Sequence, residues 1–286
     1  MTTLDTRATN TSLLRQFLVH ARCEAKTFWT TPGAYVYIVA MPLVAYAIVG
    51  FANRDTAGMT VPFGSFHLEA RERYYAAMMV FATFAAAFTS TAIGMGSRRL
   101  DGRFRRLRTT AANPVPVMGA LLATWFVITV ITDALITVMA IVFFGVRLNP
   151  DQAIRVIMCT LFASACYMAL GFAVSLFFRS PESAAPLANL VFFPLVFLSG
   201  VFYDVQFGDP WGTVLDLLPL RPLLTLLAGA FGSPTQPLSL ESIFVLLGWL
   251  MISVVLIVWR FRWSSESEPR HSRIFARPAS RTPRRS

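Results

Sequence analysis

The chain has 286 residues, of which 55% are hydrophobic and only 14% are charged, and its formal net charge is +10. This composition excludes an ordinary soluble domain and predicts a polytopic membrane protein. The only lysine, Lys26, follows an alanine, so the chain lacks the glycine-lysine pair of a phosphate-binding loop. Three cysteines without CxxC spacing and three scattered histidines give no pattern for a structural disulfide or a metal site. We therefore expect no cofactor on this chain.

Residues 1–33 are expected to form a cytoplasmic amino-terminal segment. From Ser12 to Trp29, apolar residues recur at helical spacing and charged residues occupy the other side. This pattern predicts an amphipathic helix lying in the plane of the lipid headgroups. The alternative is a helix that packs on the underside of the protein itself.

Six apolar segments follow, and each is long enough to cross a hydrocarbon core about 30 Å thick. We expect an all-α transmembrane domain over residues 34–263 and an arginine-rich cytoplasmic tail over residues 264–286. The expected spans are residues 34–52, 74–96, 117–145, 156–178, 184–202 and 243–259.

The segment between the last two spans, residues 203–240, contains an apolar stretch that charges and prolines interrupt. An apolar stretch broken in this way predicts an external helical hairpin that enters the membrane only part of the way. Its marker residues are Trp211, Asp216, Pro219 and Arg221. Arg221 is expected either to pair with an acid of the hairpin or to be solvated.

An arginine-rich block, Ser97–Pro116, separates the second and third spans and contains six arginines and one acid. Each arginine costs at least roughly 2.5 kcal/mol at the centre of a bilayer, so the block stays in water, and the positive-inside bias places it in the cytoplasm. With this orientation the cytoplasmic segments hold 19 basic and 6 acidic residues, whereas the external segments hold 6 and 8. Both termini are therefore expected in the cytoplasm. Because the excess charge lies in loops and tails, we expect contacts with lipids or proteins and no nucleic acid.

Within this block, Leu100, Phe104 and Leu107 recur at helical spacing among the arginines. A short cytoplasmic helix with such an apolar ridge fits a groove on a partner protein. The alternative is an arginine cluster that only sets the topology and binds anionic lipid.

Asp133 is the one ionisable residue near the middle of an expected span. An isolated charge there is costly, so the carboxyl group is expected to be protonated, paired or facing a polar cavity. Two roles remain open at this point. Asp133 either contacts the substrate or a gate, or makes structural hydrogen bonds to Thr129, Thr132 or Thr137.

The arginine-rich block, the span after it and the segment Phe192–Phe231 resemble the membrane subunit of type-2 ATP-binding-cassette (ABC) exporters. This group includes daunorubicin-type drug exporters and exporters of polysaccharides or lipids. The family phrase P-L-x-F-L-S-G-x-F is matched from Pro194 to Phe202, and Pro210-Trp211 and Pro219-Leu220 match the elements that follow. The family loop G-T-L-E-x-L-x-x-T-P aligns from Gly102, although arginine replaces the acidic position and the proline falls later.

The resemblance implies a permease without catalytic residues that exports its substrate from a bacterial cell (inner) membrane. It implies ABC ATPase subunits that carry ATP and Mg, and a second permease subunit, identical or paralogous. The implied coupling residues are Leu100, Gly102, Phe104, Arg105, Leu107 and Arg108. We expect the substrate path or gate to contain Asp133, Pro194, Ser199 and Gly200.

The cargo and the source of energy follow from what the spans contain. A single membrane acid cannot form a proton relay, so a separate ATPase must supply the energy. We expect an amphipathic drug or lipid as cargo, because no ladder of aromatic and polar residues for sugar stacking is apparent. A polysaccharide exporter and a membrane scaffold without transport activity are the alternatives.

Overall fold

The computed structural model describes residues 13–31, 33, 36–63, 66–102, 114–202, 211–231 and 238–260, and these are mostly helical. In this part of the chain, four helices are long and apolar enough to cross a membrane: Ala70–Leu100, Pro116–Phe144, Pro150–Ser175 and Leu240–Arg260. Shorter apolar helices cover Val36–Ala52, Ala184–Leu198 and Leu220–Phe231. The protein is therefore a mostly helical, multi-pass membrane protein.

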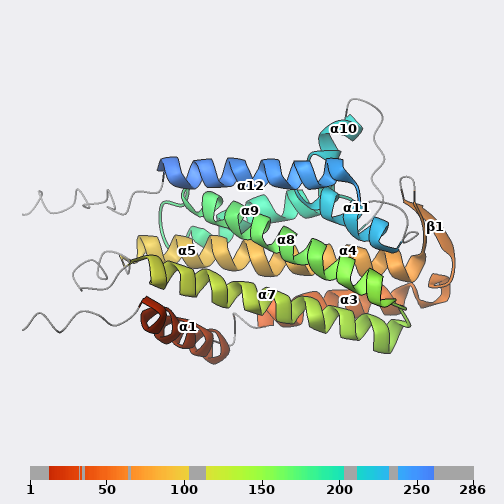
Figure 1. Cartoon of the computed structure of the whole chain (residues 1–286), viewed down its shortest axis with the longest axis horizontal. Helices are drawn as coiled ribbons and strands as arrows, with labels where there is room; N and C mark the ends of the chain where they lie inside the picture. Colours follow the sequence, from red (N-terminus) through yellow and green to blue (C-terminus); the bar gives the residue numbers. More distant parts are fainter. Residues whose placement is uncertain are drawn as a thin grey trace, which may run out of the picture.

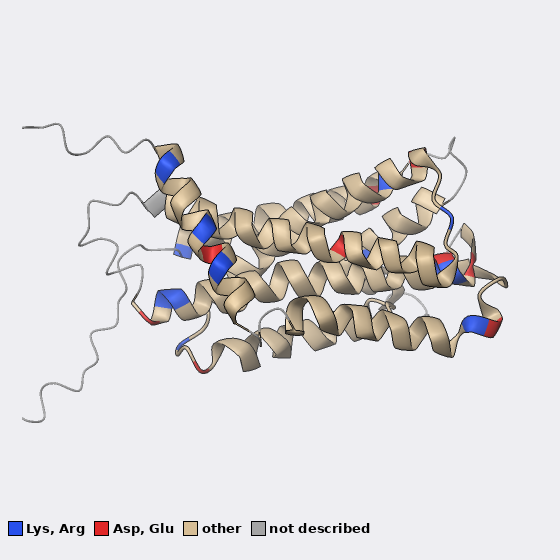
Figure 2. Cartoon of the chain, turned by 90° about the horizontal axis from the view of Figure 1, so that it is seen from below, with Lys and Arg blue, Asp and Glu red and all other residues tan. Residues whose placement is uncertain are grey.

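The four long helices and two of the shorter ones form a bundle in which successive members run in alternating directions along one axis (Figure 1). In chain order they are η2 (Val36–Ala40) with α3 (Met41–Ala52), α4 (Ala70–Phe84) with η4 (Ala85–Thr89) and α5 (Ser90–Leu100), α7 (Pro114–Phe144), α8 (Pro150–Ser175), α9 (Ala184–Leu198) and α12 (Leu240–Arg260). The basic end of the bundle holds α1 (Leu13–Thr30), the end of α5 and the start of α7. The hairpin end holds two short strands and α10 (Trp211–Asp216). Figure 2 shows the charged residues gathered mainly at these two ends.

The central helix of the bundle is the continuous segment formed by α4, η4 and α5, and 94% of its most apolar stretch is buried. It is rich in alanine, which lets neighbouring backbones approach closely; Ala82, for example, has no exposed surface. Larger rings fill the remaining space. Phe84 stacks on Phe88 and on Phe192 of α9, with ring centroids 4.7 and 5.2 Å apart. The second expected span thus begins four residues earlier and ends four residues later than predicted, and it forms the core.

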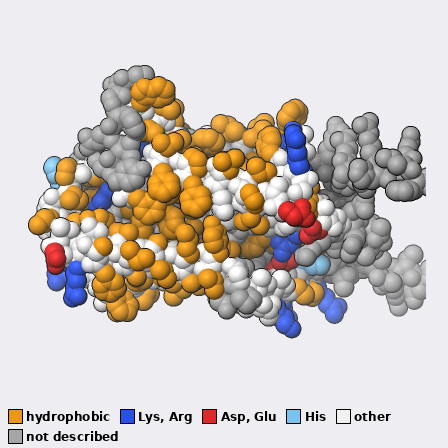
Figure 3. All heavy atoms as spheres, turned by 180° about the vertical axis from the view of Figure 1, so that it is seen from behind, with side chains coloured by type: hydrophobic (Ala, Val, Ile, Leu, Met, Phe, Trp, Pro, Cys, Tyr) orange, Lys and Arg blue, Asp and Glu red, His pale blue; other side chains and the backbone are white. Residues whose placement is uncertain are grey.

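The outer helices expose apolar side chains over the middle of the molecule. Only 33% of the most apolar stretch of α7 and 17% of that of α12 is buried. Val142 and Val258 are among their exposed side chains. Figure 3 shows a broad band of hydrophobic side chains with charged groups toward its ends. Such a band is typical of a surface that faces the hydrocarbon core of a bilayer, where apolar side chains contact lipid and not water.

The predicted amphipathic helix is present as α1, which begins and ends within one residue of the predicted limits. α1 packs beside the first half of α7 (Figure 1), and Phe28 is buried. Leu14 and Trp29 remain exposed. The helix therefore packs on the protein with one side, as the second interpretation expects, and exposes apolar residues on the other; its position in the headgroup plane stays a prediction.

Two short strands at the hairpin end are an exception within the mostly helical fold, which otherwise agrees with the all-α expectation. β1 (Thr60–Phe63) and β2 (Phe66–Glu69) pair antiparallel, with Thr60 opposite Glu69 and Phe63 opposite Phe66. Residues 53–73 lie between the first two expected spans, and Pro62 and the neighbouring glycines give this segment the composition of a loop. A proline is compatible with an edge strand, where its missing N–H breaks no ladder bond. Both strands of a two-stranded sheet are edge strands.

The predicted broken hairpin after α9 appears as α10 and α11 (Leu220–Phe231), separated by residues 217–219. α11 is buried on nearly all sides by α4, α8 and α12. Its 12 residues extend about 18 Å, which is shorter than a hydrocarbon core of about 30 Å. α11 is therefore too short to cross a bilayer, and its apolar surface is covered by protein.

Candidate functional site

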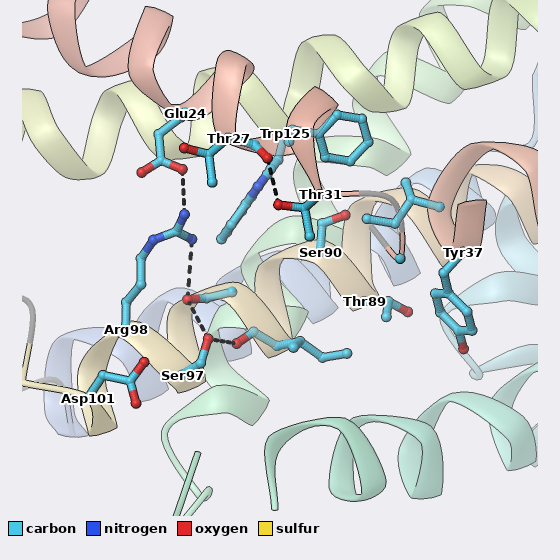
Figure 4. A pocket seen from close by; sticks show the side chains of 15 residues that line it. Glu24, Thr27, Thr31, Tyr37, Thr89, Ser90, Ser97, Arg98, Asp101 and Trp125 are labelled. Carbon is cyan, nitrogen blue, oxygen red and sulfur yellow. Dashed lines mark hydrogen bonds and ion pairs between the residues drawn. The ribbon is translucent and has the colours of Figure 1, made fainter. Parts of the chain in front are cut away.

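Arg98 in the last turn of α5 connects this helix to α1 and α7. Its guanidinium forms an ion pair with Glu24 of α1. The same group lies over the ring of Trp125, with Cζ 5.2 Å from the ring centroid, and donates to the carbonyl of Gly94 at 3.4 Å. Figure 4 shows Arg98 reaching from α5 toward Glu24. Because Glu24 belongs to α1 and Trp125 to α7, Arg98 fixes the end of α5 against these two helices.

The neighbouring arginine, Arg99, connects α5 to α8. Its Nη2 donates to the carbonyl of Phe178 at 2.9 Å, just beyond the end of α8. Arg260 of α12 approaches the same place, donating from Nε to the carbonyl of Leu176 at 3.4 Å, with Cζ 4.7 Å from the ring centroid of Phe177. Cations favour the carboxyl end of a helix, where carbonyl groups lack partners. Two arginines from different helices thus hold the end of α8.

The predicted coupling residues begin where α5 ends. Leu100 is the last residue of α5 and packs against the buried core, so its apolar contact is with this chain itself. Gly102 has a φ of 70°, the left-handed conformation that ends a helix. The other predicted coupling residues lie outside the described residues: Phe104, Arg105, Leu107 and Arg108. The chain is described again from Pro114, where α7 begins at the same end of the bundle.

Asp133 lies in the middle of α7 and is 7% exposed. Thr83 of the central helix donates from Oγ1 to its carboxyl Oδ1 at 3.0 Å. Of the three threonines predicted to bond to Asp133, Thr137 does so, donating to its backbone carbonyl at 2.9 Å. Thr129 and Thr132 donate instead to other carbonyls of their own helix. None of the three bonds to the carboxyl group, because threonine hydroxyls in a helix bond readily to the carbonyl four residues earlier.

The end of α9 contains the other predicted residues of the substrate path. Pro194 lies inside α9 and is exposed. Ser199 is buried and donates to the carbonyl of Val196 at 2.8 Å. Gly200 has a φ of 77°, and its carbonyl accepts a hydrogen bond from Nη2 of Arg73 at 2.7 Å. A buried arginine of α4 therefore holds the turn that ends α9.

The structure does not gather the substrate-path residues at one point. Asp133 is held by Thr83, and Gly200 is held by Arg73, which is ten residues away on α4. Ten helical residues extend about 15 Å. The element that these sites share is the central helix, which contacts α7 near its middle and the end of α9 near its start.

The hairpin of α10 and α11 is braced by contacts to its own residues and to α8. Arg221 pairs with Asp216, with Nε 2.7 Å from Oδ1. The hydroxyl of Tyr167, inside α8, donates to the carbonyl of Pro219 at 3.0 Å. Trp211 at the start of α10 is 65% exposed. The break between α10 and α11 is therefore fixed to the core, whereas the aromatic residue at its tip faces outward.

Thr83 and Arg73 position these sites but were missed in the sequence. Thr83 carries no charge and lies among alanines and phenylalanines, so nothing local marks it. Arg73 falls one residue before the second expected span, which begins at residue 74, although the sequence contains a signal that places it in the helix. Glu69 and Glu72 form a reciprocal capping box at the start of α4, and an acidic residue three positions after the cap is a known sign of a helix start. This spacing places Arg73 inside the helix.

Comparison with known protein families matches residues 15–231 to the ABC-2 type transporter family. The match runs from α1 to the end of α11. A search of curated proteins finds no match. The family is the transmembrane component of ABC transporters and implies a partner ATPase subunit. The amphipathic α1 and the bundle of apolar helices agree with the resemblance seen in the sequence, and the chain belongs to the ABC-2 type transporter family.

Proposed function

We propose that this chain is the permease subunit of an ATP-driven exporter of an amphipathic drug or lipid-like molecule. In this proposal residues 34–263 cross a bacterial cell membrane six times. Residues 1–33, the basic end and the tail 264–286 lie in the cytoplasm. The alternating directions of α3, the central helix, α7, α8, α9 and α12 support this topology (Figure 1). The excess of basic residues in the proposed cytoplasmic segments supports the orientation.

The connections made by the end of α5 are the observation that carries the proposal. An ATPase subunit that docks on residues 103–113 would push on the end of α5 and the start of α7. Arg98 links α5 to α1 and α7, and Arg99 links it to the end of α8. Arg260 extends the same contacts to α12. Packed helices move as units, so a displacement applied at residues 103–113 is passed to the bundle.

The proposed complex contains two ABC ATPase subunits, which bind ATP and Mg, and a second permease subunit, identical or paralogous. The outer side of α9 supports the presence of a second permease. Phe193 and Phe197 are exposed there, and their rings lie 6.4 Å apart. Phe193 also contacts the buried ring of Phe192, with centroids 5.5 Å apart. Membrane lipids would cover the rest of the apolar band.

Stimulated ATP hydrolysis tests this function. The purified permease, reconstituted with the ABC ATPase that co-purifies with it, is expected to hydrolyse ATP severalfold faster when an amphipathic cargo is added. An ATPase variant lacking its phosphate-binding lysine provides the background rate. An ATPase that binds the chain but hydrolyses ATP at the same rate with and without every cargo would contradict export and favour a scaffold.

Asp133→Asn is expected to retain folding and cargo-stimulated ATP hydrolysis within about twofold of the parent chain. Asparagine has nearly the same volume, and its amide oxygen accepts the hydrogen bond that Thr83 now donates. The measurements are the thermal midpoint in detergent and the hydrolysis rate of the assembled complex. An unchanged midpoint combined with a loss of activity of about tenfold or more would mean that the carboxyl group itself serves transport.

A further inference from the structure

A cavity of about 420 Å³ opens at the basic end, between α1, η2, the central helix and α7. Figure 4 shows its lining, in which Glu24, Arg98 and Trp125 come from three different helices. We call it the inner cavity. Among the described residues predicted to form the substrate path or the coupling site, none lines it. Its volume suits a molecule of drug size.

Thr89, in the lining of the inner cavity, has a hydroxyl group that is available to a ligand. The residue is 2% exposed, and its Oγ1 has no hydrogen-bond partner among the described residues. Other buried threonines such as Thr124 and Thr129 donate to the carbonyl four residues earlier, at 2.8 and 3.0 Å. Thr89 ends the π-helical turn η4, where that spacing is altered. Burying a hydroxyl group without a hydrogen-bond partner costs free energy. A ligand that offers a hydrogen-bond partner to the Thr89 hydroxyl therefore gains binding free energy.

The wall of the inner cavity also carries an acidic excess. Glu24, Asp101 and Arg98 are its charged lining residues, which gives a formal charge of −1. Arg98 is already engaged by Glu24 and by the face of Trp125. The carboxylate of Asp101 makes no hydrogen bond or ion pair with any described residue, and the residue is exposed. Carboxylates and aromatic rings in one cavity favour a cation.

The two available groups set the length of the ligand. Thr89 and Asp101 lie twelve residues apart along the central helix, which corresponds to about 18 Å. Ile93 and Trp125 provide apolar surface in the same lining. A ligand that uses the whole cavity is therefore long and apolar in its middle, and polar at both ends.

We propose that the inner cavity binds an elongated amphipathic cation. Its positive group lies at the mouth beside Asp101, its apolar body lies along α5 against Trp125, and its far polar atom bonds to the Thr89 hydroxyl. This inference names a cargo class for the exporter and in that respect rests on the proposed function. The binding itself requires no ATPase.

Three matched probes of equal chain length test the site. They are 12-aminododecan-1-ol, a cation with a terminal hydroxyl; dodecylamine, the cation without it; and 12-hydroxydodecanoate, the corresponding anion. Binding to the full chain in nanodiscs of zwitterionic lipid is measured by equilibrium dialysis against empty nanodiscs. We expect saturable binding of the amino alcohol at one site per chain, and no saturable binding of the anion.

Two substitutions test separately what each end of the site contributes to binding. Asp101→Asn is expected to weaken both cations by about fivefold. Thr89→Val should weaken the amino alcohol by about fivefold and leave dodecylamine unchanged, because only the former has a hydroxyl for Thr89 to meet. The matched control is Thr91→Val, since Thr91 is also buried with an unpartnered hydroxyl but does not line the cavity. Asp151→Asn, in the first turn of α8 at the other end of the bundle, is the control for charge.

A preference for the anionic probe over the cationic probes would overturn the inference. The arginines between residues 103 and 108 would favour the anion, so the anion binding as tightly as the amino alcohol excludes the proposed site. Equal weakening of both cations by Thr89→Val, or of the amino alcohol by Thr91→Val, also excludes it. Because this experiment contains no ATPase, its failure leaves the export function untouched. A cargo-independent ATPase in the earlier assay would overturn export without altering the binding result.

Discussion

Replacing both Phe104 and Leu107 with aspartate is expected to abolish association with the ATPase subunit while leaving the chain inserted in the membrane. The helical spacing of the two residues predicts an apolar ridge that enters a groove on the partner. Burying a carboxylate in such a groove without a partner costs several kcal/mol, and we expect affinity to fall at least about a hundredfold. The measurement is co-purification of the tagged permease with the ATPase from detergent extracts.

A conservative pair of substitutions provides the control for this prediction. Phe104→Leu with Leu107→Met keeps the ridge apolar and should preserve most of the association. The amount of each variant in the membrane fraction and its thermal midpoint show that insertion and folding are unchanged. Normal co-purification of the double aspartate variant with the ATPase would show that the apolar ridge is not the docking element. The alternative stated for the block, a cluster that sets topology and binds anionic lipid, would then be favoured.

Elements whose signals are local could be predicted from the sequence. α1 was predicted within one residue at each end because its apolar and charged positions alternate with a helical period. The break between α10 and α11 was predicted because prolines and charges interrupt an apolar stretch. The hairpin of β1 and β2 was missed because four-residue strands containing a proline give a weaker signal than the loop residues around them.

The identity of the central helix could not be read from hydrophobicity. The segment Ala70–Leu100 has a lower mean hydropathy than Leu240–Arg260, 1.7 against 2.6 over their most apolar stretches, and yet it is far more buried. Lipid is as apolar as a protein core, so hydropathy does not distinguish helices that face lipid from those that face protein. The usable signal was composition, because the central helix is rich in alanine whereas α12 is rich in leucine, isoleucine and valine.

Contacts between residues that are distant in the chain also could not be predicted from the sequence. Glu24 meets Arg98 and Thr83 meets Asp133 across 74 and 50 positions of the chain. Nothing in either neighbourhood marks these pairs, since they depend on how helices pack side by side. Asp133 is therefore recognisable in the sequence as an exceptional residue, whereas its partner Thr83 on another helix is not. The inner cavity belongs to the same class, because α1, η2, the central helix and α7 together create it.

Gly171→Ala is expected to destabilise the protein by about 3 kcal/mol, although alanine normally favours a helix over glycine by about 1 kcal/mol. Gly171 lies in α8 where this helix crosses the π-helical turn η4. A Cβ at position 171 would lie 2.4 Å from the carbonyl oxygen of Phe88 and 3.1 Å from the backbone nitrogen of Ala92. These are backbone atoms and cannot rotate away, so the two helices must separate. The thermal midpoint in detergent is expected to fall by roughly 10 °C.

Gly248→Ala is the matched control, because Gly248 lies inside α12 and a Cβ there would meet nothing within 4 Å. That variant should be as stable as the parent or slightly more stable, since only the helix preference of alanine acts. An equal response of the two variants would contradict the close packing of α8 on the central helix. A loss confined to Gly171→Ala would place the contact between Gly171 and Phe88 among the main determinants of the bundle. It would also imply that α8 cannot shift on the central helix without disturbing η4, and with it Thr89 in the lining of the inner cavity.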